Sequence, residues 1–404
     1  MRIRSLWALP SHVAMVGFAT VFLTYFDLYL EATGRWPLPV LAVNVCLGVV
    51  VALTIGTLVQ AAGSQSARDQ IVRMYRANAG VLLALAAVAG ATFVSAFSRT
   101  AYLDIGPRHV LYPAYSAAVI VFSMLLPVPT HRRERFRLYL FVAFAVTVGS
   151  ILTDVLQPGT FSMLPDRAAG FARNPNGGGF LVVALCTALV SFERIRAIDL
   201  LVLAATTGAV VATLSRGAAI LLLFVATCYA GSVVRHAWRR GMSTVLRRVG
   251  GLVLLVTVTV IATTLLIGQR MFATPSSRLD MLLGREQAIG PRESRVALLQ
   301  ESLELVRESP VFGYGSGYTA RMPEGPHNMY VSRWLDDGLL GIVSFVWLVV
   351  ALGLTFWKRR YMPGIVFTGV LAIEGLFSHN ILEERTFLLL PGTLLTLSFF
   401  ATLE

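Results

Sequence analysis

The sequence predicts an all-α protein that crosses a membrane about 12 times and carries one large polar insert. Of the 404 residues, 56% are hydrophobic and only 14% are charged, whereas soluble domains are about one-quarter charged. The apolar residues also form runs of roughly 20, the length that a bilayer requires of a helix. The predicted spans are residues 9–30, 38–61, 79–98, 109–129, 138–157, 176–192, 198–214, 217–234, 249–269, 338–357, 364–381 and 386–403.

Three of these spans need separate justification. The run at 9–30 follows Arg2 and Arg4 and lacks a small-residue cleavage site. We therefore expect it to be a transmembrane helix and not a cleavable signal peptide. The spans at 176–192 and 198–214 are shorter than the others, so we expect their ends to be tilted or half-buried.

Positive charge alternates between the loops and predicts the orientation of the chain. The formal charge is +12, and Lys358 is the only lysine. Cytoplasmic loops are enriched in Arg and Lys, so we expect the basic loops and both termini in the cytoplasm, and we expect no nucleic-acid partner. The basic loops contain Arg2/Arg4, Arg68/Arg73/Arg76, Arg132/Arg133/Arg135/Arg137, Arg194/Arg196, Arg235/Arg239/Arg240/Arg247/Arg248 and Lys358/Arg359/Arg360, which leaves 31–37, 99–108, 158–175, 215–216, 270–337 and 382–385 outside.

The predicted organisation has three parts: helices 1–9 in residues 1–269, a large outer loop at 270–337, and helices 10–12 in residues 338–404. Within the loop, Val296, Leu299, Leu303 and Val306 recur at helical spacing, which predicts an amphipathic helix at 293–308. The cysteines, Cys46, Cys186 and Cys228, all lie in apolar spans. They indicate neither a disulfide framework nor a metal site.

Arg216 is the sharpest single signal for a site. It stands between Ser215 and Gly217 in the short connection between the spans at 198–214 and 217–234. An arginine close to membrane depth is costly unless it is paired or lines a watery cavity, and this marks it as a functional candidate. The alternative is an arginine that extends its side chain to the head groups and merely caps the hairpin.

The outer loop contains a second set of candidates. Arg295 begins the amphipathic helix, and both positions at which a helical salt-bridge partner would sit, Leu298 and Leu299, are apolar. His327 could serve as a general base, although a lone loop histidine can also be a bystander. Asn328 could orient this histidine. Tyr314 and Arg321 complete the set.

Two features of the same loop leave alternatives open. Asp336 and Asp337 could raise the pKa of His327, or they could cap the N-terminus of the span at 338–357, where aspartate is favoured. The glycine-rich segment Gly313–Gly317 follows a helix and not a strand, which excludes a nucleotide-binding loop of the usual kind. It is either a flexible turn or a backbone cradle for an anion.

A third group lies at residues 167–179, before the span at 176–192. Asn174-Pro175-Asn176 is a turn signal, and the three glycines that follow let the backbone approach a ligand closely. Arg173 and Asn176 are its candidate binding residues. We expect all of these groups to face the outer side of the membrane.

Together these segments resemble the O-antigen ligase and polymerase superfamily of bacterial membrane glycosyltransferases. FARNPNGGGFL is similar to the family's Asn-rich turn, and TLSRGA at 213–218 to its short outer hairpin with an essential arginine. Arg295 followed by ESPVFGYGSG resembles the family's Arg, amphipathic helix and Pro-x-x-Gly-x-Gly. The spacing of His327-Asn328, nine residues, Gly338, two residues and Gly341 is similar to the ligase signature.

The resemblance implies a helical fold of the type C glycosyltransferase kind and an active site on the periplasmic face of the bacterial inner membrane. It implies transfer of a glycan, without metal or cofactor, from undecaprenyl pyrophosphate to a hydroxyl of the lipid A–core oligosaccharide. Matched motif by motif, Arg216 and Arg295 would hold the pyrophosphate, and His327 would contact the acceptor hydroxyl. Arg173, Asn176, Asn328, Tyr314 and Arg321 would bind substrate, and membrane lipids would surround the protein.

Three other functions compete with a ligase: a polymerase, a transporter, and a non-catalytic assembly protein that uses the outer loop for docking. Polymerases of the superfamily have an Arg-ten-Gly spacing, which Arg167 and Gly178 match. A transporter of lipid-linked glycans would place ionisable residues in mid-span. Here Asp27, Asp154 and Glu374 lie near span ends or are isolated, which argues against a transporter. The three consecutive glycines at 177–179 make the Arg-ten-Gly match easy by chance, so we prefer the ligase to the polymerase.

Overall fold

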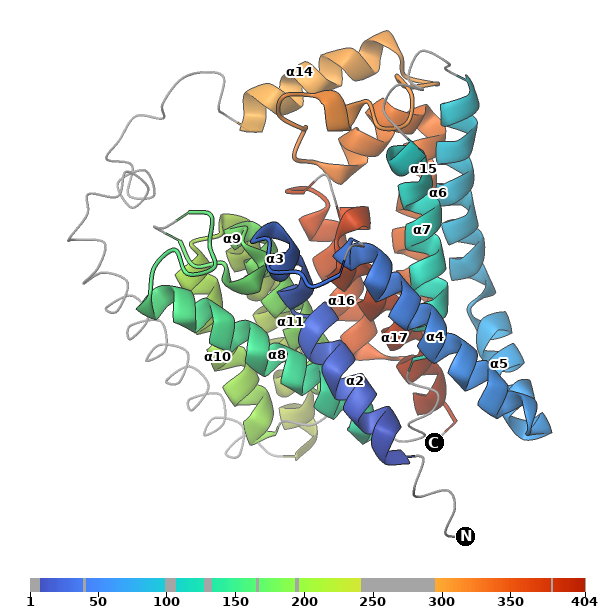
Figure 1. Ribbon diagram of the computed structural model, residues 1–404, viewed down its shortest axis with the longest axis vertical. Helices are drawn as coiled ribbons and strands as arrows, with labels where there is room; N and C mark the ends of the chain where they lie inside the picture. Colours follow the sequence, from blue (N-terminus) through green and yellow to red (C-terminus); the bar gives the residue numbers. More distant parts are fainter. Residues whose placement is uncertain are drawn as a thin grey trace. The chain divides into compact units, whose positions relative to one another are not determined.

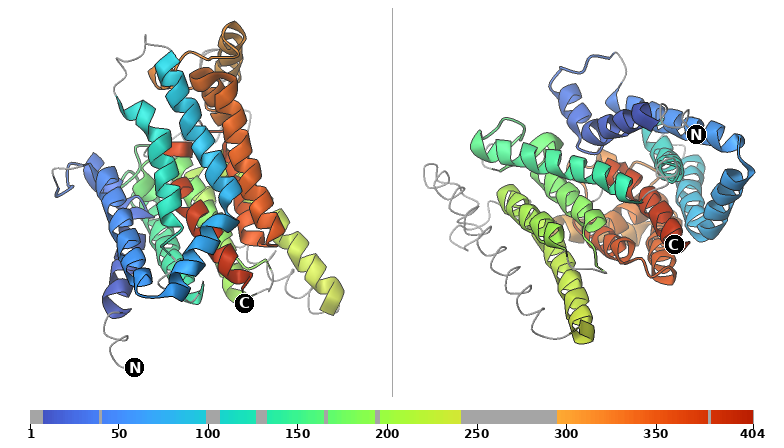
Figure 2. Two further views of the ribbon diagram at one scale, coloured as in Figure 1. Left: turned by 90° about the vertical axis from the view of Figure 1, so that its right-hand side faces the viewer. Right: turned by 90° about the horizontal axis from the view of Figure 1, so that it is seen from below.

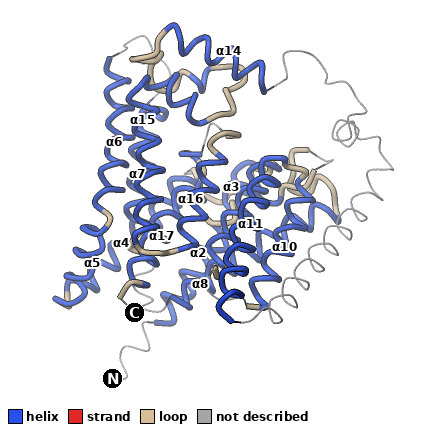
Figure 3. The backbone as a smooth tube through the Cα atoms, turned by 180° about the vertical axis from the view of Figure 1, so that it is seen from behind, coloured by secondary structure: helices blue, strands red, loops and turns tan. Residues whose placement is uncertain are grey.

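The structure, a computed structural model, describes residues 8–38, 41–98, 107–126, 133–164, 167–192, 196–240, 295–378 and 381–403. All regular secondary structure in these ranges is helical (Figure 3). This confirms the predicted all-α class. The predicted span at 249–269 and residues 270–294 of the predicted insert lie outside the described residues.

Four of the described helices are long and apolar enough to cross a membrane. They contain the segments Ala79–Ala96, Phe136–Leu156, Arg216–Arg235 and Met329–Lys358. Shorter apolar helices of 10–17 residues lie within six other predicted spans, and about twelve crossings therefore stay a prediction. These shorter segments are Asn44–Val59, Ala114–Ser123, Pro175–Leu189, Ala197–Thr213, Met362–Glu374 and Leu388–Ala401.

Three predicted boundaries were wrong. The span predicted at 9–30 is broken into α2 Ala8–Phe22 and α3 Phe26–Ala32, whose apolar parts meet at an angle of 51°. Tyr25, at the break, has a left-handed backbone with φ of 62°. The basic loop predicted at 62–78 is instead mostly α5 Gln65–Ala77, which begins at the N-cap residue Ser64. The helix predicted to start at 338 starts at Met329.

The chain divides into two compact units, and each is described by itself. The first unit comprises the described parts of residues 1–52 and 130–276. Its centre is α9 Pro175–Leu189, in which every residue from Gly178 onwards is buried. The helices α8 Arg133–Leu156, α10 Ala197–Thr213 and α11 Arg216–Arg240 pack around it. A helix that is apolar on all sides needs such a position.

The second unit comprises the described parts of residues 53–129 and 277–404, and it is built on two long helices. α15 Met329–Lys358 packs along α6 Ala79–Ser98 (Figure 2), and α14 Arg295–Glu308 lies across one end of α15 (Figure 1). The remaining helices are α7 Pro107–Ser123, α16 Met362–Glu374 and α17 Arg385–Ala401, and α4 Ala42–Ala62 passes from the first unit into the second.

Arg359 links three helices at the end of the second unit that contains α5. Its guanidinium donates to the Leu395 carbonyl at 2.9 Å, the Ser398 hydroxyl at 2.8 Å and the Ala77 carbonyl at 2.9 Å. Burial lowers the pKa of Arg359 to about 10. The side chain therefore stays positively charged near neutral pH, and it joins the C-terminal ends of α15, α17 and α5.

Candidate functional site

The predicted site residues fall into both units. Arg173, Asn176 and Arg216 belong to the first unit, whereas Arg295, Tyr314, Arg321, His327 and Asn328 belong to the second. Each group is therefore built up within its own unit.

In the first unit, Arg167 joins the Asn-rich turn to the hairpin between α10 and α11. Its side chain is buried, with 5% exposed. Its Nε donates to the Thr213 carbonyl at the end of α10 at 2.8 Å, and its Nη2 donates to Asn176 Oδ1 at 3.0 Å. The structure thus brings together two segments that are about 40 residues apart in sequence and that the sequence treated as separate candidates.

The glycines that follow Asn176 explain how closely these segments pack. A Cβ on Gly179 would lie 2.6 Å from Ala218 Cβ and 3.2 Å from Thr213 Oγ1. A Cβ on Gly178 would overlap the Ala169 carbonyl oxygen. A side chain at either position would therefore push α9 away from the hairpin or from the preceding loop.

Arg216 is the first residue of α11, and its side chain is exposed. Buried Ser215 caps the helix, because its hydroxyl accepts the Ala218 N–H at 3.3 Å. The first turn of α11 contains no acidic residue. A guanidinium placed beside the positive end of a helix dipole favours an anion at that position. In the part of the chain that the structure describes, no hydrogen bond or ion pair to a protein group holds this guanidinium.

Asp154, near the end of α8, organises the loop that carries Arg173. Its Oδ1 accepts the N–H of Phe161 at 2.7 Å, and its Oδ2 accepts the N–H groups of Ala169 at 3.0 Å and Gly170 at 2.9 Å. One buried carboxylate therefore holds both limbs of the loop. Arg173 is half-buried and has a left-handed backbone with φ of 60°.

In the second unit, His327 and Asn328 stand at the start of α15. Asn328 Oδ1 accepts the N–H groups of Tyr330 at 3.0 Å and Val331 at 3.1 Å, so Asn328 is the N-cap of this helix. His327 is half-buried and has a φ of 48°. The Met329 N–H donates to the Gly375 carbonyl at 2.7 Å, which fixes the start of α15 against the end of α16.

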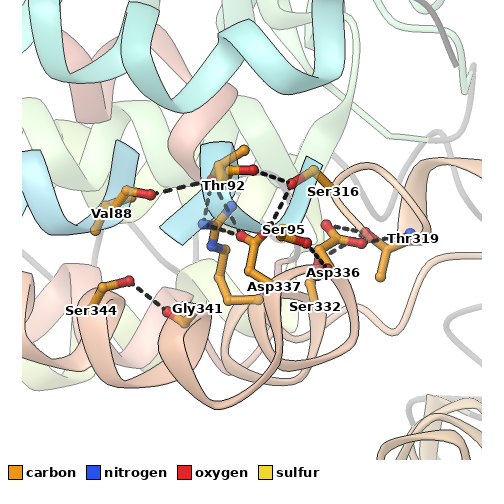
Figure 4. Close-up of polar contacts among 11 residues, drawn as sticks. Val88, Thr92, Ser95, Ser316, Thr319, Ser332, Asp336, Asp337, Gly341 and Ser344 are labelled. Atoms are coloured by element: carbon orange, nitrogen blue, oxygen red, sulfur yellow. Dashed lines mark hydrogen bonds and ion pairs between the residues drawn. The ribbon is translucent and has the colours of Figure 1, made fainter. Parts of the chain in front are cut away.

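The predicted capping role of Asp336 and Asp337 was wrong, because the helix begins nine residues before Gly338. Both carboxylates are buried within α15. Asp337 pairs with Arg333 and accepts the Ser316 hydroxyl at 2.7 Å (Figure 4). Thr92 of α6 accepts from Arg333 Nη2 at 2.8 Å, and its hydroxyl donates to Asp337 at 3.3 Å.

The neighbouring Asp336 holds the loop before His327 (Figure 4). Its carboxylate accepts the backbone N–H of Thr319 at 2.8 Å and the Thr319 hydroxyl at 3.0 Å. Its carbonyl accepts the Ser95 hydroxyl of α6 at 2.8 Å. The two acids therefore tie α6, α15 and the loop at 316–319 into one buried polar network.

The glycine-rich segment docks onto an interruption in α15. Gly338 has φ of 65° and ψ of −154°, which breaks the helix. The Tyr314 N–H donates to the Leu335 carbonyl at 2.7 Å, the Gly315 N–H to the Asp336 carbonyl at 3.0 Å, and the Leu339 N–H to the Val311 carbonyl at 3.0 Å. The Tyr314 and Gly315 N–H groups are thus used inside the protein, which favours a structural turn over an anion cradle at these two positions.

The other candidates of the outer loop take different positions. The Tyr314 hydroxyl donates to the Leu305 carbonyl at 3.0 Å and contacts Glu308 at 2.9 Å, and its ring stacks on Tyr318 with a centroid distance of 4.5 Å. Arg321 is exposed at the end of a short 3-10 turn. Arg295 is the first residue of α14, and its side chain lies outside the described part of the structure.

The predicted amphipathic helix at 293–308 is confirmed over the described residues 295–308, although only part of its predicted apolar face is buried. Val306 packs with Val331 and Leu335 of α15, and Leu299 packs against the same cluster. Val296 and Leu303 are instead 65% and 37% exposed.

Asp154, Arg333 and Thr92 were not expected to organise the site, and Arg167 was considered only for its spacing to Gly178. Thr92 and Arg333 are 241 residues apart in the chain, whereas Asp154 binds a loop 7–16 residues further on. The only local signal was a charged or polar residue within or beside an apolar run. Among the described residues, no group of three or more His, Cys, Asp or Glu side chains could hold a metal ion.

Comparison with known proteins adds one finding. No curated protein matches the chain. Residues 200–346 match a family model described as O-antigen ligase. The matched region begins in α10 and includes the Arg216 hairpin, α14, the glycine-rich segment, His327 and the break at Gly338. This match supports the resemblance: residues 200–346 are similar to the O-antigen ligase family.

Proposed function

We propose that this protein is an O-antigen ligase. It moves a glycan from undecaprenyl pyrophosphate to a hydroxyl of the lipid A–core oligosaccharide at the periplasmic face of the bacterial inner membrane. The observation that carries the proposal is the family match over 200–346, because that region holds Arg216, Arg295 and His327. The exposed guanidinium of Arg216 at a helix N-terminus supports it.

The proposed reaction is a direct displacement that inverts the anomeric carbon. The acceptor oxygen forms the new glycosidic bond, and the bond from the anomeric carbon to the pyrophosphate oxygen breaks. Arg216 and Arg295 bind the departing pyrophosphate, since guanidinium groups stay charged and pair with phosphate through two hydrogen bonds. His327 receives or orients the proton of the acceptor hydroxyl. Arg173, Asn176, Asn328 and Arg321 contact the glycans, and Tyr314 shapes the loop.

We further propose about twelve spans, a type C glycosyltransferase-like fold and cytoplasmic termini. The second unit supports this orientation. α5, with Arg68, Arg73 and Arg76, lies at the end opposite α14 (Figure 1), and Arg359 is hydrogen-bonded to the last turn of α5. Basic residues at one end and a polar insert at the other are what the positive-inside rule expects of cytoplasmic and periplasmic ends.

The polymerase alternative rests on the spacing of Arg167 and Gly178. Arg167 is buried and donates to Thr213 and Asn176, and a Cβ on Gly178 would meet the Ala169 backbone. Both residues therefore have packing roles that account for them without a glycan. This favours the ligase.

The test is an assay of the purified full chain with undecaprenyl-linked glycan and lipid A–core, with and without a metal chelator. Capped lipopolysaccharide supports the ligase. Lengthened carrier-bound glycan indicates the polymerase, and movement of the carrier across the bilayer without transfer indicates a transporter.

His327→Ala should lower the transfer rate by about 10²–10⁴-fold, the usual contribution of a general base, while the protein still inserts normally. Unchanged transfer by this variant would remove the proposed role of His327.

A further inference from the structure

The turn between α14 and the glycine-rich segment exposes two large apolar side chains in an otherwise polar loop. Val311 is 54% exposed and Phe312 is 66% exposed. Side chains of this kind at the tip of a turn cost free energy in water. A neighbouring surface that covers them would remove this cost.

The turn is held in place by its backbone, so these side chains are presented and not merely mobile. The Pro310 carbonyl accepts the indole N–H of Trp334 at 2.7 Å, and the Val311 carbonyl accepts the Leu339 N–H at 3.0 Å. The Ser309 hydroxyl donates to the Gly313 carbonyl at 2.7 Å. Bonds on both sides of Phe312 therefore hold its backbone in place at the surface.

The exposed turn is continuous with an exposed apolar face of α15. Leu339, which is bonded to Val311, is 48% exposed, and Leu340 and Val343 are 57% and 55% exposed. These residues begin the apolar part of a helix that is long enough to cross a membrane. The exposed face of such a helix meets lipid, so the apolar surface of the turn lies at the edge of a lipid-facing surface.

Trp334 is an aromatic residue of the kind expected at the membrane interface. Its ring is half-buried, and its N–H is satisfied by Pro310. Tryptophan and other aromatic side chains gather where the bilayer core meets the head groups, with their apolar parts turned to the lipid. A phenylalanine beside a tryptophan, at the polar end of a membrane helix, fits this interfacial zone.

We propose that Val311 and Phe312 form a lipid anchor that inserts into the membrane interface next to the end of α15. The anchor holds the loop between α14 and α15 at the level of the lipid head groups. It requires only that α15 spans the membrane, so it stands or falls separately from the glycosyl transfer proposed above.

Spin-label accessibility of the full chain in lipid nanodiscs tests the anchor. The background replaces Cys46, Cys186 and Cys228 by alanine, and a nitroxide is attached to Phe312→Cys. Leu340→Cys on α15 is the lipid-facing control, and Glu304→Cys on α14 is the water-facing control, because Glu304 is exposed. Collision rates with oxygen, which concentrates in lipid, are compared with those of a water-soluble nickel chelate.

We expect the oxygen-to-nickel ratio at 312 to be several-fold above that at 304 and close to that at 340. A ratio at 312 equal to that at 304 would overturn the anchor. Low collision rates with both reagents would also overturn it, because protein would then cover the site. A label at Val311→Cys repeats the measurement if the change at 312 disturbs folding.

Discussion

Three residues in or beside the predicted site have backbone conformations that side chains rarely adopt. Arg173, Leu214 and His327 have φ of 60°, 49° and 48°. They make up three of the five non-glycine residues with positive φ in the described part of the chain, the others being Tyr25 and Arg360. Such residues cost roughly 1–3 kcal/mol each and persist where surrounding contacts impose them, often at functional sites.

The contacts that impose these conformations differ among the three residues. His327 directly precedes the N-cap residue Asn328, and Leu214 precedes the cap residue Ser215. The Arg173 N–H donates to the Gly170 carbonyl, and its carbonyl accepts the Met163 N–H, both at 3.0 Å. Each strained residue is thus fixed next to a helix N-terminus, the positive end of the helix dipole.

Replacement of Arg216 by lysine tests whether the guanidinium acts through paired hydrogen bonds to phosphate or only through its charge. Arg216→Lys keeps the positive charge but loses the paired hydrogen bonds to phosphate. We expect glycan transfer to fall by about 10²–10³-fold, as for the loss of one preorganised donor to a developing charge. The measurement is the initial rate of transfer by purified protein.

Arg235→Lys is the matched control, because Arg235 is an exposed arginine near the opposite end of the same helix. It should retain the rate of the unchanged protein. If Arg216→Lys also retains that rate, the paired hydrogen bonds of the guanidinium are not needed, which argues for a hairpin cap or a simple positive charge at this position.

The pairing of Arg333 with Asp337 predicts a large effect on stability from a small change. Both side chains are buried, with 5% and 3% exposed. Asp337→Asn leaves the Arg333 charge uncompensated, which typically costs about 3–5 kcal/mol. We expect the variant to unfold at a clearly lower temperature in detergent and to lose transfer, because Ser316 and the loop after it also lose a partner.

The control uses the other described salt bridge, Arg196–Asp199, in which the arginine side chain is 40% exposed. Asp199 is buried, but it keeps the N–H groups of Ser191 and Arg196 as donors when the guanidinium is removed, so Arg196→Gln should lower the unfolding temperature less than Asp337→Asn does. Equal shifts of the unfolding temperature in the two variants would show that burial does not determine how much the Arg333–Asp337 pair contributes to stability.

At the scale of the elements, the sequence predicted those helices and turns that depend on residues close together in the chain. The spacing of Leu299 and Val306 predicted α14, and the Ser215–Gly217 segment predicted the hairpin before α11. The start of α15 was missed, because Ser332, Arg333, Asp336 and Asp337 interrupt the apolar pattern. Their partners include Thr92 and Ser95, which are more than 200 residues away in sequence and which no local pattern reveals, together with Ser316 and Thr319.

The interruption of α15 explains the glycine spacing physically. A Cβ on Gly338 would overlap the Val311 carbonyl and approach Phe312 C at 2.6 Å, and a Cβ on Gly313 would lie 2.6 Å from both Gly338 N and Leu335 O. A Cβ on Gly341 would lie 2.6 Å from Asp337 Cβ. Gly313 and Gly338 are therefore required where the loop and the broken helix approach each other, and Gly341 where the two parts of α15 meet.

Substitution of Gly338 by alanine tests this account. The variant must either adopt a positive φ with a Cβ or displace the turn at Val311, and we expect a loss of stability of about 1–3 kcal/mol from the backbone alone. Gly353→Ala in the same helix is the control, since its Cβ would make an ordinary contact of 3.6 Å with Thr368. Alanine there should be neutral or stabilising. Thermal unfolding in detergent compares the two, and equal melting temperatures would contradict the docked loop.

At the scale of the whole molecule, hydropathy and charge predict the number of apolar runs and their orientation, but they do not predict how each run packs against its neighbours. α9 is only 15 residues long because it begins at Asn174 and Pro175 and is enclosed by its neighbours. Its short length agrees with the predicted short span at 176–192, whereas its burial within the first unit is not reported by any hydropathy pattern. The tie between Asn176 and Arg167 likewise depends on tertiary packing.

The orientation of the second unit gives the last prediction. If α5 faces the cytoplasm and α14 the periplasm, a membrane-impermeant maleimide added to cells with a permeable outer membrane should label Glu301→Cys and not Asp69→Cys. Both residues are exposed, so a difference in labelling reports the side of the membrane and not burial. After the inner membrane is opened, both positions should react equally. Labelling of Asp69→Cys in cells with an intact inner membrane would invert the topology, and a periplasmic reaction involving His327 could then not stand, because α5 and α14 lie at opposite ends of one unit (Figure 1).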